Sequence, residues 1–72
     1  GVENLEELNL SHNQIQYIDN NVFNGLKSLK KLYLNSNCFT YLNFKNNFGD
    51  LSSLEVLELY ENNISKINTK DY

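Results

Sequence analysis

Apolar residues recur along the chain in a spacing that is repeated three times. Each copy has leucine at its first, fourth and sixth positions, asparagine at its ninth and an apolar residue at its eleventh. The copies begin at Leu5, Leu29 and Leu54, so they are offset by 24 and 25 residues (29 − 5 and 54 − 29). Positions four to six alternate with a period of two, which is typical of a short strand that buries one face. The pattern therefore predicts three strands whose inward residues are Leu8 and Leu10, Leu32 and Leu34, and Leu57 and Leu59.

A strand this short cannot bury its apolar face alone, whereas a stack of three copies can. Equivalent strands would lie side by side in a parallel sheet, about 4.8 Å apart, and their leucines would merge into one core. The return leg of each copy is too short for a long helix, so we expect extended backbone or one turn of 3₁₀ helix. In the first copy this leg would be closed inward by Ile15, Ile18, Phe23 and Leu26.

The return legs carry two further features. Phe23, Phe48 and Tyr72 occupy equivalent positions, so we expect them to stack as an aromatic spine along this side. The middle copy also has one extra residue between Leu42 and Phe48. We expect this residue to form a small bulge.

The motif L-x-x-L-x-L-x-x-N-x-L, at this repeat length, resembles the signature of the leucine-rich repeat family. Apolar residues thirteen positions after each opening leucine, Ile18, Leu42 and Ile67, extend the similarity to the subtype of about 24 residues found in extracellular proteins. No proline follows these three residues, although the subtype often has one. The resemblance implies an α/β solenoid: a right-handed coil forming a horseshoe segment. Its short parallel strands would line the concave face, and its convex side would be mostly extended or 3₁₀.

The domain organisation expected from this register is one unit over residues 1–72, with about three repeats and no caps. Gly1 and Val2 match Gly25 and Leu26, which precede the second repeat, and Tyr72 falls partway through the third. We therefore expect the chain to be an excerpt of a longer solenoid.

Asparagine stands at the inward ninth position of every repeat, as Asn13, Asn37 and Asn62. A buried amide without hydrogen-bond partners costs roughly 1–3 kcal/mol. The family resemblance implies that these residues form a structural asparagine ladder, bonded to backbone groups of neighbouring coils.

The outward residues of the strands form columns across the expected sheet. Tyrosine is enriched at protein–protein contacts, so Tyr33 and Tyr60 are the leading candidates for ligand binding, with Asn35, Glu58 and Asn9 beside them. The alternative is that tyrosine is present as a good strand former. The predicted columns are Glu7, Lys31 and Val56; Asn9, Tyr33 and Glu58; and Ser11, Asn35 and Tyr60.

Two N-glycosylation sequons are present, at Asn9-Leu10-Ser11 and at Asn63-Ile64-Ser65. A chain this rich in asparagine, serine and threonine produces one or two by chance, so the signal is weak. A glycan on Asn9 would obstruct the proposed binding surface.

Charge and composition narrow the classes of function. The net charge is −3 and Lys30-Lys31 is the largest basic cluster, which argues against nucleic-acid binding. No apolar run approaches the roughly 18 residues of a membrane span, so we expect no membrane contact by this segment. Cys38, the single cysteine, cannot form an internal disulfide and is expected to be half-exposed. No catalytic constellation, phosphate-binding loop or metal-ligand spacing is present, so we expect neither enzymatic activity nor a cofactor.

The function predicted from these observations is protein recognition through the concave face. The repeats resemble those of Toll and Toll-like receptors and of insect leucine-rich immune proteins. This resemblance implies an extracellular glycoprotein, either a receptor ectodomain or a secreted factor of innate immunity, that binds a protein ligand, a pathogen-derived ligand or a co-receptor. One alternative is a cytoplasmic assembly scaffold that uses the repeats as a rigid spacer. Another is a cell-surface adhesion protein.

Overall fold

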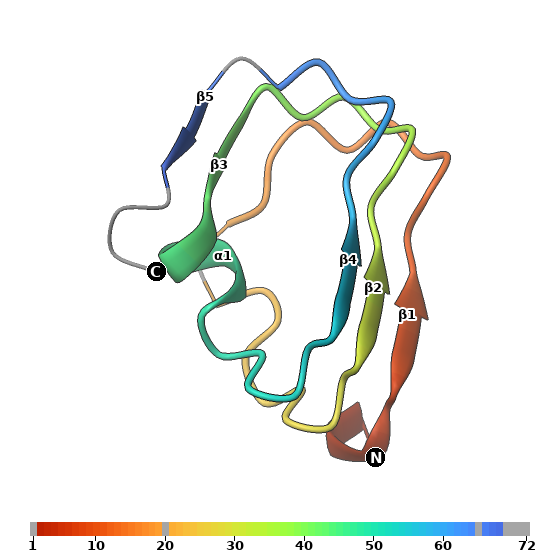
Figure 1. Ribbon diagram of the computed structural model, residues 1–72, viewed down its shortest axis with the longest axis vertical. Helices are drawn as coiled ribbons and strands as arrows, with labels where there is room; N and C mark the ends of the chain where they lie inside the picture. Colours follow the sequence, from red (N-terminus) through yellow and green to blue (C-terminus); the bar gives the residue numbers. More distant parts are fainter. Residues whose placement is uncertain (1, 20, 65, 69–72) are drawn as a thin grey trace.

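Three parallel strands, one from each repeat, form the larger sheet of the computed structural model, which describes residues 2–19, 21–64 and 66–68, the last three by backbone alone. They are β1 (Glu7–Asn9), β2 (Lys31–Tyr33) and β4 (Val56–Glu58), in the spatial order β1-β2-β4 (Figure 1). The register pairs Leu8 with Leu32 and Leu32 with Leu57. The predicted columns through Lys31 and Tyr33 are therefore confirmed.

The return legs lie opposite this sheet (Figure 1). A second parallel pair joins β3 (Tyr41–Asn43) to β5 (Lys66–Asn68). The helix α1 (Phe44–Phe48) follows β3 directly, and a 3₁₀ turn, η1 (Val2–Asn4), precedes β1. The expectation of extended or 3₁₀ backbone is thus wrong for the middle repeat, where the return leg contains an α-helical turn.

The extra residue of the middle repeat lies in the stretch that forms α1. Asn43 is the helix N-cap, and its side-chain oxygen accepts a hydrogen bond from the backbone nitrogen of Asn46 at 3.1 Å. Asparagine is among the preferred N-cap residues because its side chain satisfies an amide that has no partner within the helix. The predicted bulge is therefore an ordered, capped turn of helix.

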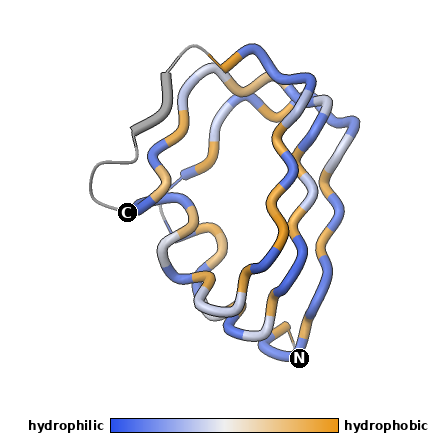
Figure 2. The backbone as a smooth tube through the Cα atoms, in the orientation of Figure 1, coloured by the Kyte–Doolittle hydropathy of each residue, from blue (hydrophilic) through white to orange (hydrophobic). Residues whose placement is uncertain are grey.

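The core is centred on the middle repeat, which has a neighbour on each side. Polar and apolar residues alternate along the strands (Figure 2), and the apolar ones face the interior. The strand leucines of the outer repeats are half-buried and pack against this core; they are Leu8, Leu10, Leu57 and Leu59. The fully buried side chains belong to the middle repeat: Leu29, Leu32, Leu34, Phe39, Leu42 and Phe48.

The aromatic spine is confirmed for two of its three predicted members. The rings of Phe23 and Phe48 stack with their centroids 6.1 Å apart and an angle of 15° between their planes. Phe44 adds an edge contact to Phe48 at 5.3 Å. Tyr72 lies outside the described residues. The stacked phenylalanines bury the return side of the first two repeats.

Asn47 links the return legs of the first and second repeats through its buried side chain. Its oxygen accepts a hydrogen bond from the backbone nitrogen of Asn43 at 3.0 Å, and its nitrogen donates to the carbonyl of Ile18 at 2.9 Å. One amide thus closes the start of α1 and bridges to the preceding repeat. Sequence reasoning missed this residue. The available signal was the N-cap asparagine four positions earlier, which predicts a helix start.

Substitution of Asn47 by alanine is expected to lower the free energy of unfolding by about 1–3 kcal/mol, because it leaves two partly buried backbone groups without this partner. The measurement is a urea titration followed by circular dichroism. Asn46→Ala is the matched control, since Asn46 is exposed and only its backbone nitrogen bonds to the cap. Equal unfolding midpoints for the two variants would contradict the bridging role of Asn47.

Candidate binding face

The face of the three-stranded sheet that points away from the core is open. Within the described part of the chain, β3, α1 and β5 all lie on the other side of the sheet (Figure 1). The outward residues of the strands are exposed or half-buried, whereas Leu32, which points the other way, is fully buried. The sheet therefore offers an uncovered polar and aromatic surface.

Tyr33, Glu58 and Tyr60 lie on the β2 and β4 side of this surface, and we call these three residues the binding face. Tyr33 pairs with Glu58 in the register of β2 and β4, and Tyr60 follows two residues after Glu58. Tyr60 is 58% exposed, while Tyr33 and Glu58 are half-buried. One phenol group thus lies on β2, one carboxylate lies on the adjacent strand β4, and the second phenol group follows just after β4. They supply apolar area, hydrogen-bonding groups and a negative charge.

Asn35 does not fit the surface predicted for it, because its side chain is only 4% exposed. It lies in the middle repeat, where the adjacent repeats flank it on both sides at the positions of Ser11 and Tyr60. Its backbone carbonyl accepts a hydrogen bond from the nitrogen of His12 at 3.1 Å. Asn35 is therefore part of the packing between repeats, and we remove it from the candidate ligand-binding residues.

Asn9 is exposed at the first strand, and its side-chain oxygen is already engaged. It accepts hydrogen bonds from the backbone nitrogen and from the hydroxyl of Ser11, the nitrogen lying at 2.9 Å. Asn63 is also exposed, and its backbone nitrogen donates to the carbonyl of Phe39 at 3.1 Å. Ser65 of the second sequon lies outside the described residues. Glycosylation of Asn9 or Asn63 stays a prediction.

The inward asparagines lie where each strand ends. The side-chain nitrogen of Asn37 donates to the carbonyl of Leu10 in the first repeat and to that of Leu34 in its own, both at 3.0 Å. Its oxygen accepts from the backbone nitrogen of Ile15 at 3.2 Å. Asn37 therefore joins two repeats through both ends of its amide.

Asn62 repeats this arrangement one coil further on. Its nitrogen donates to the carbonyl of Leu34 at 3.0 Å, and its oxygen accepts from the backbone nitrogen of Phe39 at 3.0 Å. Asn13, in the first repeat, is exposed, and among the described residues it bonds to carbonyls of its own repeat, at Leu10 and Ser11. Of these three inward asparagines, Asn37 and Asn62 bond to a neighbouring repeat in the described part of the chain.

The residue before each of these asparagines has left-handed backbone. The φ angles are 59° at His12, 58° at Ser36 and 57° at Glu61. A residue other than glycine pays roughly 1–2 kcal/mol in this region, so the conformation must be imposed by the surroundings. The backbone nitrogen of Ser36 bonds to the carbonyl of Tyr60 at 2.9 Å, and its hydroxyl bonds to the carboxylate of Glu61. The three residues turn the chain out of the strands.

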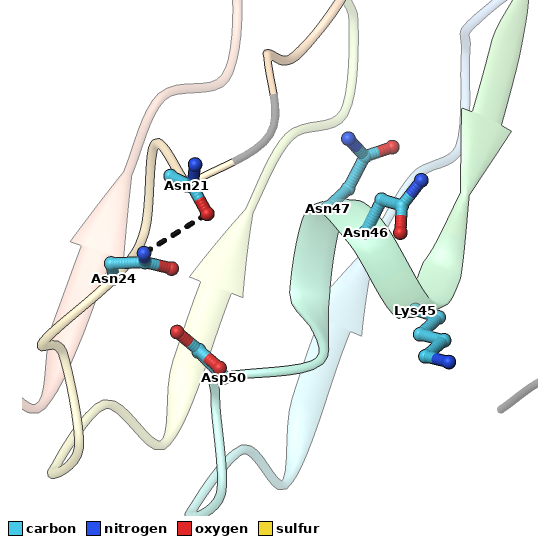
Figure 3. A pocket seen from close by; sticks show the side chains of 6 residues that line it. All are labelled: Asn21, Asn24, Lys45, Asn46, Asn47 and Asp50. Carbon is cyan, nitrogen blue, oxygen red and sulfur yellow. Dashed lines mark hydrogen bonds between the residues drawn. The ribbon is translucent and has the colours of Figure 1, made fainter.

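Two hollows are lined by described residues that do not belong to the binding face. One, of about 240 Å³, is lined on the return side by the first-repeat turn and by α1 (Figure 3). The other, of about 600 Å³, lies near the strand exits and includes Cys38, which is an exposed free thiol. Sequence reasoning gave no indication of the first hollow, whose lining residues are Asn21, Asn24, Lys45, Asn46, Asn47 and Asp50.

The described residues contain no group of three or more histidine, cysteine or acidic side chains that could hold a metal ion. Within the same part of the chain, no helix has the length and apolar character needed to cross a bilayer.

Comparison with known proteins gives one family match and several relatives. The family model described as "Leucine rich repeat" matches residues 1–39, which is more than half of the chain. The chain is 46% identical to human Toll-like receptor 3 over 69 residues, covering 90% of the chain and 8% of the receptor. It is 39% identical to mouse podocan over 64 residues and 38% identical to pig fibromodulin over 63, covering 88% of the chain in both cases. It spans 10% of podocan and 42% of fibromodulin. No solved structure is significantly similar to the chain.

Proposed function

Because the chain belongs to the leucine-rich repeat family, we propose that it is a protein-recognition module that binds its partner through Tyr33, Glu58 and Tyr60. Leucine-rich repeat proteins are generally binding modules. In solenoid proteins the concave face of the stacked repeats is the usual binding surface. The observation that carries the proposal is the exposure of Tyr60, two residues after the Glu58 that pairs with Tyr33, on the uncovered side of a sheet. Tyrosines supply large contact area and are enriched among the residues that dominate interface energy.

We place the module in an extracellular protein, as part of a receptor ectodomain or of a secreted recognition factor. The resemblance of the repeats to the extracellular subtype supports this location, as does the similarity to a Toll-like receptor. We further infer that the repeats continue the family's right-handed coil, with the β1-β2-β4 sheet on the concave side. The partner would be a protein, a pathogen-derived ligand or a co-receptor.

Double substitution of Tyr33 and Tyr60 by alanine is expected to weaken partner binding by at least tenfold, because removal of an interface residue that dominates the energy costs about 2 kcal/mol or more. Wild-type and variant chains would be immobilised and exposed to extracellular fluid from the source organism. Retained proteins would be identified by mass spectrometry, and their affinities measured by surface plasmon resonance.

The chain offers its own matched control in Tyr17 and Tyr41, which are 69% and 44% exposed on the return leg. Replacing both by alanine removes the same chemistry from the opposite side. We expect this control to retain the partner. Loss of binding in the control, but not in the Tyr33 and Tyr60 variant, would indicate that the partner binds the return side instead. Thermal melts of all three chains would separate lost contacts from lost folding.

A further inference from the structure

The turn of the first return leg brings an exposed asparagine directly before a glycine. Asn24 and Gly25 are both exposed. The backbone nitrogen of Asn24 bonds to the carbonyl of Asn21 at 3.2 Å, and its side-chain nitrogen donates to the side-chain oxygen of Asn21 at 3.1 Å (Figure 3). Gly25 has a φ of 86° and open space on the side where a Cβ would stand. The turn thus holds Asn24 at the rim of the polar hollow.

The backbone nitrogen of Gly25 is a potential nucleophile toward the side-chain carbonyl carbon of Asn24. Among the described residues, none accepts a hydrogen bond from this nitrogen. Glycine has no Cβ and reaches backbone conformations closed to other residues, so the nitrogen can approach the Asn24 side chain with little steric hindrance. Attack would form the bond that closes a five-membered ring.

We propose that Asn24 is a site of spontaneous deamidation in the folded chain. The Gly25 nitrogen bonds to Cγ of Asn24 and gives up its proton, while the side-chain nitrogen gains one and leaves as ammonia. The cyclic imide formed is opened by water at either carbonyl, which yields aspartate or isoaspartate. The net change consumes one water and releases one ammonia, with no oxidation or reduction. Water, from the solvent around this exposed turn, is the only co-reactant.

The product would change the chemistry of the hollow on the return side. Asn24 and Asp50 line the same hollow, so conversion adds a second carboxylate there. It also replaces the nitrogen that donates to Asn21 with an oxygen that cannot donate. The hydrogen bond that braces the turn would then be lost, and oxygen would face oxygen. Isoaspartate would in addition lengthen the backbone within the turn.

Asn35 provides an internal comparison within the same chain, because it is followed by Ser36, another small residue. Its side chain is almost wholly buried, and the nitrogen of Ser36 already donates to the carbonyl of Tyr60 at 2.9 Å. The nitrogen of Ser36 cannot approach the side chain of Asn35 without breaking this hydrogen bond to Tyr60. Asn21 and Asn63 are exposed but precede the branched residues Val22 and Ile64. The structure thus singles out Asn24 among the described asparagines.

The test is to age the purified full chain in mildly alkaline buffer and map its peptides by mass spectrometry over time. Isoaspartate would be detected by enzymatic methylation. We expect the peptide containing Asn24 to gain the mass of an amide-to-acid exchange before any other peptide, with both aspartate and isoaspartate as products. Asn24→Gln, which moves the carbonyl one carbon further from the nitrogen, should remove this early change and leave the circular dichroism spectrum unaltered.

Two results would overturn the proposal. One is a folded chain that stays unmodified at Asn24 while a short peptide of the same sequence reacts in parallel, since the fold would then protect the site. The other is earlier conversion of Asn35 or of another asparagine in the folded chain. Gly25→Ala is a secondary variant, and its strained φ makes a melting curve necessary before its rate is compared.

Discussion

Substitution of Phe39 by alanine is expected to lower the free energy of unfolding by about 3–5 kcal/mol. The side chain is 0% exposed and is among the largest fully buried groups of the middle repeat. Its removal reduces the apolar area buried in the core. It also leaves a cavity in the middle repeat, between the first and the third. Small domains are stabilised by only about 5–15 kcal/mol in total, so this single change would remove a large part of the stability.

The position equivalent to Phe39 in the first repeat is Ile15, and it supplies the control. Ile15 is half-buried, so Ile15→Ala should be less damaging. Urea titrations monitored by circular dichroism would compare the two variants. Should Phe39→Ala fail to fold at all, Phe39→Leu keeps most of the volume and should fold with an intermediate midpoint. A smaller loss for Phe39→Ala than for Ile15→Ala would refute a core centred on the middle repeat.

Substitution of Asn37 by alanine is expected to destabilise the chain by about 1–3 kcal/mol, because backbone groups on two repeats lose partners. The amide nitrogen of Ile15 bonds to this side chain. The carbonyls of Leu10 and Leu34 also accept from it, and each has a second asparagine donor, Asn13 and Asn62 respectively. Asn37→Asp should also destabilise, since it keeps the acceptor for Ile15 but places a carboxylate oxygen against two carbonyls.

Asn13→Ala is the control for Asn37, because it removes the same side chain at the equivalent position without breaking a contact between repeats. Its effect should be smaller, since Asn13 is exposed and water can replace its bonds. Thermal melts would compare the stability of the two variants. An equal drop in melting temperature would mean that the amide of Asn37 acts only within its own turn.

Much of the larger sheet could be predicted from the sequence because its determinants are local and periodic. The alternation in Leu32-Tyr33-Leu34 specifies which side chains face inward, and a one-residue slip would expose every leucine. Matching motif positions across the offsets of 24 and 25 residues then fixes the register, so Tyr33 had to lie beside Glu58. The family itself follows from the same spacing.

The features that sequence reasoning missed depend on contacts between repeats. Asn35 has an outward position in the strand pattern, and its burial follows only from the neighbours on both sides. Asn47 occupies the position of Val22 in the first repeat, so the register gives no reason to expect a buried amide there. The pairing of β3 with β5 likewise involves segments that show no strict alternation.

The two joints between the repeats differ in how their return legs are held. Between the second and third repeats, backbone pairing is present on both legs, as β2 with β4 and as β3 with β5. Between the first and second, β1 pairs with β2, but the carbonyl of Ile18 is met by the side chain of Asn47.

This difference changes what holds the return legs together. Strand pairing fixes a spacing of about 4.8 Å on both legs of the second and third repeats. Between the first and second repeats, the side chain of Asn47 bonds to the carbonyl of Ile18, and one backbone bond joins Cys38 to Ile15. The contact at Ile18 therefore depends on the identity of one side chain, so we expect a substitution at position 47 to loosen this joint and to leave the other joint intact.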